Sequence, residues 1–177
     1  ETIVVSVLGV VLHGIALPAE PVWITPLALA AATVGFLVWN WPPARIFMGD
    51  GGSGFLGLML GAFSLQAAWA SPNLLWAWLI LLGVFVVDAT VTLVRRLGRG
   101  ERVHEAHRSH AYQHAALSCR AHLPVTLGVG VINLCWLFPV AVLVASGGLE
   151  GATGLIVAYA PLVAVAVSLR AGVPGRI

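Results

Sequence analysis

A short polar stretch at residues 40–53 separates two long apolar runs and contains one carboxylate, Asp50. Glycines surround this aspartate, and glycine lets backbone N–H groups approach a ligand closely. If the next run is a helix, its first N–H groups and the positive end of its dipole favour an anion such as phosphate. Mg²⁺ binds one or two carboxylates together with phosphate oxygens. We therefore predict that Asp50 binds Mg²⁺, with Mn²⁺ as an alternative ion, beside a diphosphate; an ordinary Asp-Gly turn is the competing interpretation.

The residues after Asp50 are the predicted anion-binding group: Gly51, Gly52 and Ser53. Ser53 is also a candidate cap for the following helix, because serine oxygens accept hydrogen bonds from the first free N–H groups of a helix.

A second carboxylate, Asp88, lies in the apolar run 74–94, about 9–10 Å along a helix from the end of the run, which Arg95 and Arg96 follow. An acid within a membrane helix is by default a functional-site hypothesis, because an exposed charge in the bilayer is costly. The alternatives are an ion pair between Asp88 and a nearby arginine, or a carboxylate that reaches the lipid headgroups. We predict a functional role for Asp88, and we leave that role open.

The stretch 95–123 is the second polar connection and contains six arginines and five histidines. His107, His110 and His114 are spaced three and four residues apart, so they would share one face of a helix. Arginine and histidine together predict a phosphate-binding patch. Two alternatives are a basic loop that binds lipid headgroups and a zinc site of three histidines. Zinc is the weakest of these, because the adjacent Arg108 would repel the cation.

The composition indicates which elements must position these groups. The chain is 59% hydrophobic and 9% charged, whereas soluble domains carry about a quarter charged residues. We therefore predict an all-α, polytopic integral membrane protein, with residues 1–177 as one membrane domain. Its small net charge of +2 does not indicate nucleic-acid binding. Six apolar runs approach the length of about 20 residues that a membrane helix needs: 2–17, 22–39, 54–70, 74–94, 124–146 and 151–169.

With six crossings, the connections 40–53 and 95–123 and the end of the chain lie on the same side of the membrane. All nine basic residues are arginines, and all nine fall in these three regions. By the positive-inside rule this side is cytoplasmic. The predicted active site therefore faces the cytoplasm.

Residues 40–57 closely resemble the signature Asn-x-Pro-Pro-Ala-x-x-Phe-Met-Gly-Asp-x-Gly-Ser-x-x-Leu-Gly of the polyprenyl-phosphate N-acetylhexosamine-1-phosphate transferases, a group of glycosyltransferase family 4. The resemblance continues to Asp88 with its Arg-Arg pair, and to the Arg-Ser-His-x-Tyr-Gln sequence at 108–113. Family members often carry His-x-His-His in this loop, and only His110 matches it here. The Tyr-Gln form is similar to the branch that transfers Fuc2NAc or QuiNAc phosphates in O-antigen synthesis.

The resemblance implies a Mg²⁺-dependent enzyme of the bacterial inner membrane. It would transfer an N-acetylhexosamine-1-phosphate from a UDP-sugar to a polyprenyl phosphate such as undecaprenyl phosphate, releasing UMP and starting a surface polysaccharide. Asp50, Asp88 and His110 would be catalytic, and Asn40, His107 and Arg108 would join the substrate-binding residues. The family's upstream Asp-Asp and Asp-Gly-x-Asp-Gly motifs are absent from residues 1–177. We therefore expect the C-terminal half of such an enzyme, inactive by itself, with a homodimer as one option for its assembly. A multi-span transporter and a non-catalytic membrane subunit are the alternative functions.

Overall fold

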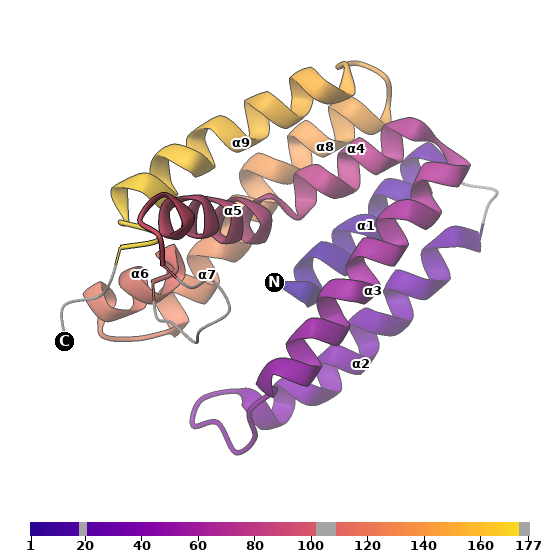
Figure 1. The fold of residues 1–177 in the computed structure, drawn as a ribbon. Coiled ribbons are helices and arrows are strands. Elements are labelled where there is room, and N and C mark those ends of the chain that lie inside the picture. Colours follow the sequence, from indigo (N-terminus) through magenta and orange to yellow (C-terminus); the bar gives the residue numbers. More distant parts are fainter. Residues whose placement is uncertain (18–20, 102–108, 174–177) are drawn as a thin grey trace.

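The computed structural model describes residues 1–17, 21–101 and 109–173, and every regular element within them is helical. In chain order these elements are α1 (Thr2–Ala16), a 3₁₀ turn (Pro21–Trp23), α2 (Ile24–Asn40), α3 (Gly49–Ala70), α4 (Pro72–Leu81), α5 (Gly83–Gly98), α6 (Ala111–Cys119), α7 (Leu123–Ile132), a π-helical turn (Asn133–Leu137), α8 (Phe138–Ala145) and α9 (Gly151–Ser168). Figure 1 shows their arrangement. The predicted all-α membrane fold is confirmed.

The sequence predicted six membrane spans, but fewer helices among the described residues are long enough to cross a membrane. Among the described residues, three helices are long and apolar enough to cross a membrane: Gly49–Ala70, Leu123–Ala145 and Gly151–Ser168. A fourth is present if α4 and α5 together form one span. The helices α1 and α2 are apolar but contain only 15 and 17 residues. At 1.5 Å per residue they are shorter than the hydrocarbon layer of about 30 Å.

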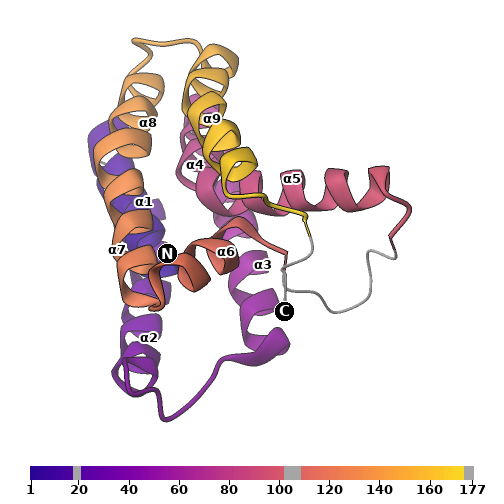
Figure 2. The ribbon, with the colours of Figure 1, turned by 90° about the vertical axis from the view of Figure 1, so that its left-hand side faces the viewer.

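The fourth predicted run is not one straight helix, because α4 and α5 meet at an angle of 68°. Gly83 begins α5, and a Cβ atom there would lie 3.0 Å from the Tyr159 ring and 3.1 Å from Leu162 of α9. The Tyr159 hydroxyl donates a 2.7 Å hydrogen bond to the carbonyl of Leu79 in the last turn of α4. Carbonyls at a helix end need such outside partners. Helix α9 therefore supports the bend, and α5 projects from the bundle in Figure 2.

Helix α4 occupies the centre of the bundle, where it packs against α1 and α3 on one side and against α8 and α9 on the other. Its Trp78 is fully buried, and its ring lies against Gly9 of α1 so closely that a Cβ there would be 2.4 Å away. The His13 ring of α1 lies tilted against that of Trp78, with the ring centres 6.0 Å apart, and its Nδ1 is hydrogen-bonded to the Gly9 carbonyl at 2.8 Å. These contacts fix α4, and thereby the point from which α5 departs.

The segments predicted to carry chemistry gather toward one end of this bundle. Both views place the connection between α2 and α3, the helix α6, the start of α7 and the end of α9 away from the α8–α9 connection (Figures 1 and 2). The fold thus brings the Asp50 segment and the histidine-bearing segment to the same end of the molecule.

Candidate active site

The connection between α2 and α3 is held in shape by Asn40, the last residue of α2. The Asn40 side chain donates a 2.8 Å hydrogen bond to the Ile46 carbonyl, across six residues. The Arg45 backbone N–H returns to the Trp39 carbonyl at 2.9 Å, and the Arg45 guanidinium lies 5.9 Å from the centre of the Trp39 ring. In this geometry Asn40 shapes the loop that leads to Asp50. A direct contact between Asn40 and substrate remains a prediction.

Asp50 lies in the first turn of α3, which begins five residues earlier than the predicted run at 54. Gly49 starts the helix with φ of +66°, a backbone conformation that strongly favours glycine. The Asp50 side chain is exposed, and its carboxylate has no hydrogen-bond or ion-pair partner among the described residues. An anionic side chain in the first turn is favoured by the helix dipole. This carboxylate is therefore held in place by backbone alone and is accessible to a ligand.

Ser53 does not cap this helix, so that part of the prediction is wrong. Because α3 already begins at Gly49, Ser53 lies within the first turns, where its hydroxyl donates a 3.1 Å hydrogen bond to the backbone carbonyl of Asp50. Gly51 falls in the first turn, whose N–H groups have no partners within a helix, whereas Gly52 is the fourth residue after the cap Met48, where the hydrogen bonds of the helix begin. Helix geometry thus leaves the Gly51 amide without an intrahelical partner, and anion binding by Gly51, Gly52 and Ser53 stays a prediction.

The donor set around Asp50 fits Mg²⁺ only in partnership with a substrate. No group of three or more His, Cys, Asp or Glu side chains within the described ranges could hold a metal ion. Mg²⁺ does not need such a cage, because it commonly takes one or two carboxylates and completes its shell with water and phosphate oxygens. A single free carboxylate beside an anion-binding helix end meets that requirement. A zinc site, which needs three or four protein ligands, does not fit the described histidines.

Asp88 lies on α5 and contacts the first turn of α6. Its Oδ1 accepts a 2.8 Å hydrogen bond from the Ala111 N–H, and its Oδ2 lies 3.4 Å from the Tyr112 nitrogen. The Thr92 hydroxyl also donates to Oδ1, at 3.3 Å. A carboxylate at this position satisfies the free N–H groups of the helix end and complements its dipole. The alternative interpretation, an ion pair with an arginine, is not what the described residues show.

His110 immediately precedes α6 and is held from several directions. Its Nδ1 lies 3.6 Å from Asp88 Oδ1, and its backbone N–H donates to the Gln113 side chain at 3.2 Å. Its ring is stacked on that of Tyr112 with the ring centres 5.8 Å apart. Asp88 therefore fixes the helix end that presents His110. This geometry gives Asp88 a positioning role, while its direct participation in catalysis stays a prediction.

The arginines at the end of α5 bind groups of the protein. The carboxylate of Glu101 receives Arg96 at 3.0 Å and Arg99 at 2.6 Å. Hydrogen bonds from these two guanidiniums, with that of Arg99 the stronger, lower the pKa of Glu101 below its usual value. Arg95 donates to a backbone carbonyl after α9. The predicted phosphate patch is therefore partly occupied by protein contacts, whereas His107 and Arg108 lie outside the described residues.

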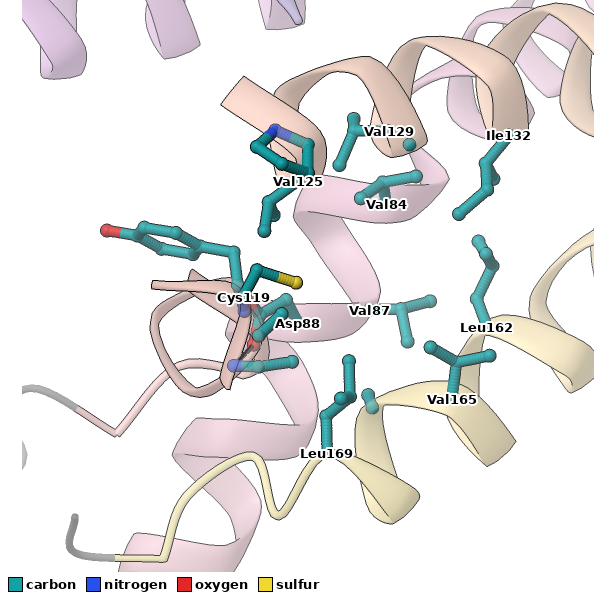
Figure 3. Close-up of a pocket in the computed structure, with 16 residues that line it drawn as sticks. Val84, Val87, Asp88, Cys119, Val125, Val129, Ile132, Leu162, Val165 and Leu169 are labelled. Carbon is teal, nitrogen blue, oxygen red and sulfur yellow. Dashed lines mark hydrogen bonds between the residues drawn. The ribbon is translucent and has the colours of Figure 1, made fainter. Parts of the chain in front are cut away.

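Two apolar cavities flank α5. One, of about 280 Å³, lies between α5, α6, α7 and α9 (Figure 3). Asp88 and Cys119 lie on one side of it, and Ile132 and Leu162 lie across from them. The other, of about 300 Å³, is lined by Ser53 and the first half of α3 on one side and by the start of α5 on the other. Both cavities are suited to hydrocarbon, and each borders a segment that carries a candidate polar residue.

Comparison with known proteins finds a family match that includes the Asp50 segment. The model of glycosyl transferase family 4 matches residues 1–68, which include the connection 40–48 and most of α3. A Bacillus subtilis protein named as a probable undecaprenyl-phosphate N-acetylglucosaminyl 1-phosphate transferase is 38% identical over 88 residues, or 49% of this chain and 25% of its own length. The decaprenyl-phosphate N-acetylglucosaminephosphotransferase of Mycolicibacterium smegmatis is 37% identical over 139 residues, covering 68% and 34%. The chain belongs to the polyprenyl-phosphate hexosamine-1-phosphate transferase family.

A third relative of this transferase family is the phospho-N-acetylmuramoyl-pentapeptide-transferase of a Synechococcus strain, which is 41% identical over 69 residues, or 39% of this chain and 18% of that protein. The chain thus spans at most about a third of the length of these relatives. No solved structure matches it significantly.

Sequence reasoning missed two groups that support the elements of the candidate site. Tyr159 supports the bend that aims α5, and residues 171–173 contact both α5 and the segment of His110. A tyrosine inside an apolar run is an ordinary membrane-helix residue, and Ala-Gly-Val carries no functional pattern. No signal in the sequence alone identified either group.

Proposed function

We propose that the protein transfers an N-acetylhexosamine-1-phosphate from a UDP-sugar to a polyprenyl phosphate, probed most simply with undecaprenyl phosphate, and that it thereby initiates a cell-surface polysaccharide such as O-antigen. The observation that carries this proposal is the free Asp50 carboxylate at the start of α3, within the residues that match the family. It is also supported by the names of the relatives, of which two specify a polyprenyl phosphate and the third a phospho-sugar transferase.

In this proposal Asp50 holds Mg²⁺ against the diphosphate of the nucleotide sugar. The ion would neutralise the phosphate charge that develops during transfer, which is the main requirement of phosphoryl-transfer catalysis. The free amides at the start of α3, including that of Gly51, would hydrogen-bond a phosphate oxygen, with Gly52 and Ser53 beside it. Because these groups lie in the first turn of a helix, little reorganisation is needed when the substrate binds.

His110 would contact the sugar phosphate or the diphosphate as a hydrogen-bond donor, together with His107 and Arg108 from the neighbouring loop. The lipid phosphate oxygen would attack the phosphorus next to the sugar, and UMP would leave. The apolar cavities beside α5 are suited to isoprenoid carbons close to the reacting phosphate. We place this reaction at the cytoplasmic face of the bacterial inner membrane, where the soluble nucleotide sugar is supplied.

The test is transfer of labelled sugar phosphate into an organic-extractable lipid by the intact protein, with Mg²⁺ or with excess chelator. Asp50→Asn removes the charge and is expected to lower kcat at least 100-fold, and chelator is expected to abolish product formation. Glu150→Gln is the matched control, because Glu150 is also a carboxylate at a helix start and caps α9 at the opposite end. Near-normal turnover by Asp50→Asn, or full activity in chelator, would remove Asp50 and the metal from the mechanism.

The bend between α4 and α5 is the one feature that favours a transporter, because transporter sites often use broken helices near the bilayer centre. However, the residues at this bend are apolar, and the polar contact that the structure places beside them is the hydrogen bond from the Tyr159 hydroxyl to the Leu79 backbone carbonyl. A liposome flux assay run beside the UMP-release assay separates the two functions. Sugar flux without UMP release would favour transport.

A further inference from the structure

We propose that residues 171–173, which follow α9 and are called the exit segment below, position the histidine-bearing helix α6 relative to α5. This inference deepens the proposed function, since α6 and its preceding His110 form part of the candidate active site. The exit segment is a positioning element and touches no reacting group itself.

The exit segment binds α5 through its backbone carbonyls. Arg95 Nη1 donates to the Ala171 carbonyl at 3.0 Å, and Arg99 donates to the Gly172 carbonyl. Ala171 is fully buried, and Gly172 is buried as well. Two of the basic side chains that the sequence assigned to phosphate therefore bind this segment.

The same segment also binds the residues on either side of the α6 start. The Gly172 N–H donates to the carbonyl of Ser109, which directly precedes His110. On α6 itself, His114 Nε2 donates to the Val173 carbonyl at 3.0 Å. Apart from the Asp88 cap, the exit segment is thus a second connection between α5 and the His110 region. Among the hydrogen bonds of the described residues given above, removing it would leave the Asp88 side chain to hold the start of α6 on α5.

Gly172 is the residue that allows this close approach. Its φ is +78°, which a residue with a side chain rarely adopts. A Cβ atom there would lie 2.8 Å from the Arg95 Cβ and 3.1 Å from the Thr92 carbonyl oxygen on α5. Gly172→Ala therefore pushes the segment off α5 by both strain and collision.

Gly147 offers a matched control. Its φ is +75°, so alanine there meets the same backbone strain, but the nearest atom to an added Cβ is 3.9 Å away. Gly147 also lies in the α8–α9 connection, at the opposite end of the bundle. The two alanine variants should lose similar thermal stability from strain, whereas only Gly172→Ala should disturb α6.

The first measurement reports on the exit segment whatever the activity of the protein. Val173→Cys is introduced into the intact protein with Cys119 and Cys135, both free and exposed, changed to serine. We expect Gly172→Ala to raise the maleimide labelling rate of this cysteine about tenfold and Gly147→Ala to leave it unchanged. Equal labelling in all three proteins would refute the binding of the segment to α5.

The second measurement is transfer activity. We expect Gly172→Ala to lower kcat at least tenfold, because small displacements of a substrate-contacting group cost large factors in rate, and Gly147→Ala to retain kcat. Faster labelling with unchanged kcat would show that the segment is bound but does not position the site. If the intact protein shows no transferase activity, hydrogen exchange of residues 109–119 tests instead whether the exit segment positions α6. Faster exchange in Gly172→Ala alone supports positioning, and equal exchange in both variants overturns it.

Arg95 provides a double-mutant cycle. If Arg95 acts only through the exit segment, Arg95→Met combined with Gly172→Ala is no less active than the worse single variant. Arg95→Lys keeps a donor for the Ala171 carbonyl and should retain most of the activity. If Arg95 instead binds the substrate phosphate directly, the two losses multiply, and that result would overturn the proposal.

Discussion

The role of Asp88 can be tested by removing its cap on α6. Asp88→Ala leaves the Ala111 N–H, which is 2.8 Å from the carboxylate and belongs to a buried residue, without its acceptor. A hydrogen bond to a charged group contributes about 1.5–3 kcal/mol, and the longer contacts to Tyr112 and Thr92 add little. A local loss of about 2 kcal/mol corresponds to roughly 30-fold faster opening of the first turn of α6.

Asp88→Asn should produce a smaller effect. The amide oxygen can still accept from the Ala111 N–H, but charge-assisted hydrogen bonds are about twice as strong as neutral ones. We therefore expect a loss of about 1 kcal/mol and roughly fivefold faster opening. The rate of opening should therefore increase in the order wild type, Asp88→Asn, Asp88→Ala, and this order is a stricter test than either rate alone.

The assay is amide hydrogen exchange of the intact protein, followed in peptides that cover residues 109–119, because exchange reports local opening directly. Asp50→Asn is the control, since the Asp50 carboxylate has no partner among the described residues and its loss should leave α6 unchanged. Exchange that is the same in Asp88→Ala and wild type would refute the cap. Activity abolished in Asp88→Asn without faster exchange would instead assign Asp88 a direct catalytic role.

Three further predictions concern the framework of the site. Gly9→Ala should lower the free energy of unfolding by about 1–3 kcal/mol, because the added Cβ would lie 2.4 Å from the Trp78 ring. Gly14→Ala on the same helix is the control, since its Cβ would meet no atom within 4 Å and should not destabilise the protein. Denaturant titration in detergent compares the two variants. Tyr159→Phe leaves the carbonyl at the α4–α5 bend without its donor and should lower stability by about 1–2 kcal/mol in the same titration. Arg99 and Arg96 lower the pKa of Glu101 in the folded protein, so the charged carboxylate stabilises the fold above pH 4.5. The melting temperature of wild type should therefore exceed that of Glu101→Gln above this pH, and the difference should disappear as the pH falls through the lowered pKa. A difference that grows in acid would contradict the assignment.

The sequence was sufficient for the membrane class and the Asp50 segment, because both depend on local properties. Apolar composition requires a membrane environment, and a glycine-rich turn before an apolar run predicts an exposed carboxylate at a helix start. The same local reasoning gave the wrong cap at Ser53, since it assumed that the helix begins where the apolar run begins. In the structure Gly49 starts the helix, so the glycines themselves form its first turn.

The partners of Asp88 could not be predicted because they depend on contacts between distant segments. An apolar run shows no bend in its composition, and the 68° turn after α4 is supported by Tyr159, about 80 residues away in the chain. Only after that turn does Asp88 point to the start of α6, which begins 23 residues later. The protein partners of Arg95 and Arg99 could not be predicted for a related cause: they are backbone carbonyls after α9, and a sequence does not show where these carbonyls lie.

The two carboxylates therefore differ in a way that bears on mechanism. Asp50 has a position fixed by the backbone and no protein partner among the described residues, which is what a ligand-binding carboxylate requires. Asp88 has its oxygens occupied by the start of α6, which is what a positioning carboxylate requires. In the proposed mechanism His110 contacts the substrate, and ordering such a group in advance removes a cost that would otherwise be met during the reaction. By holding the helix end beside His110, Asp88 would then assist the reaction proposed at Asp50. Loss of Asp50 should then remove chemistry and leave α6 ordered, whereas loss of Asp88 should loosen α6 and reduce the rate in proportion.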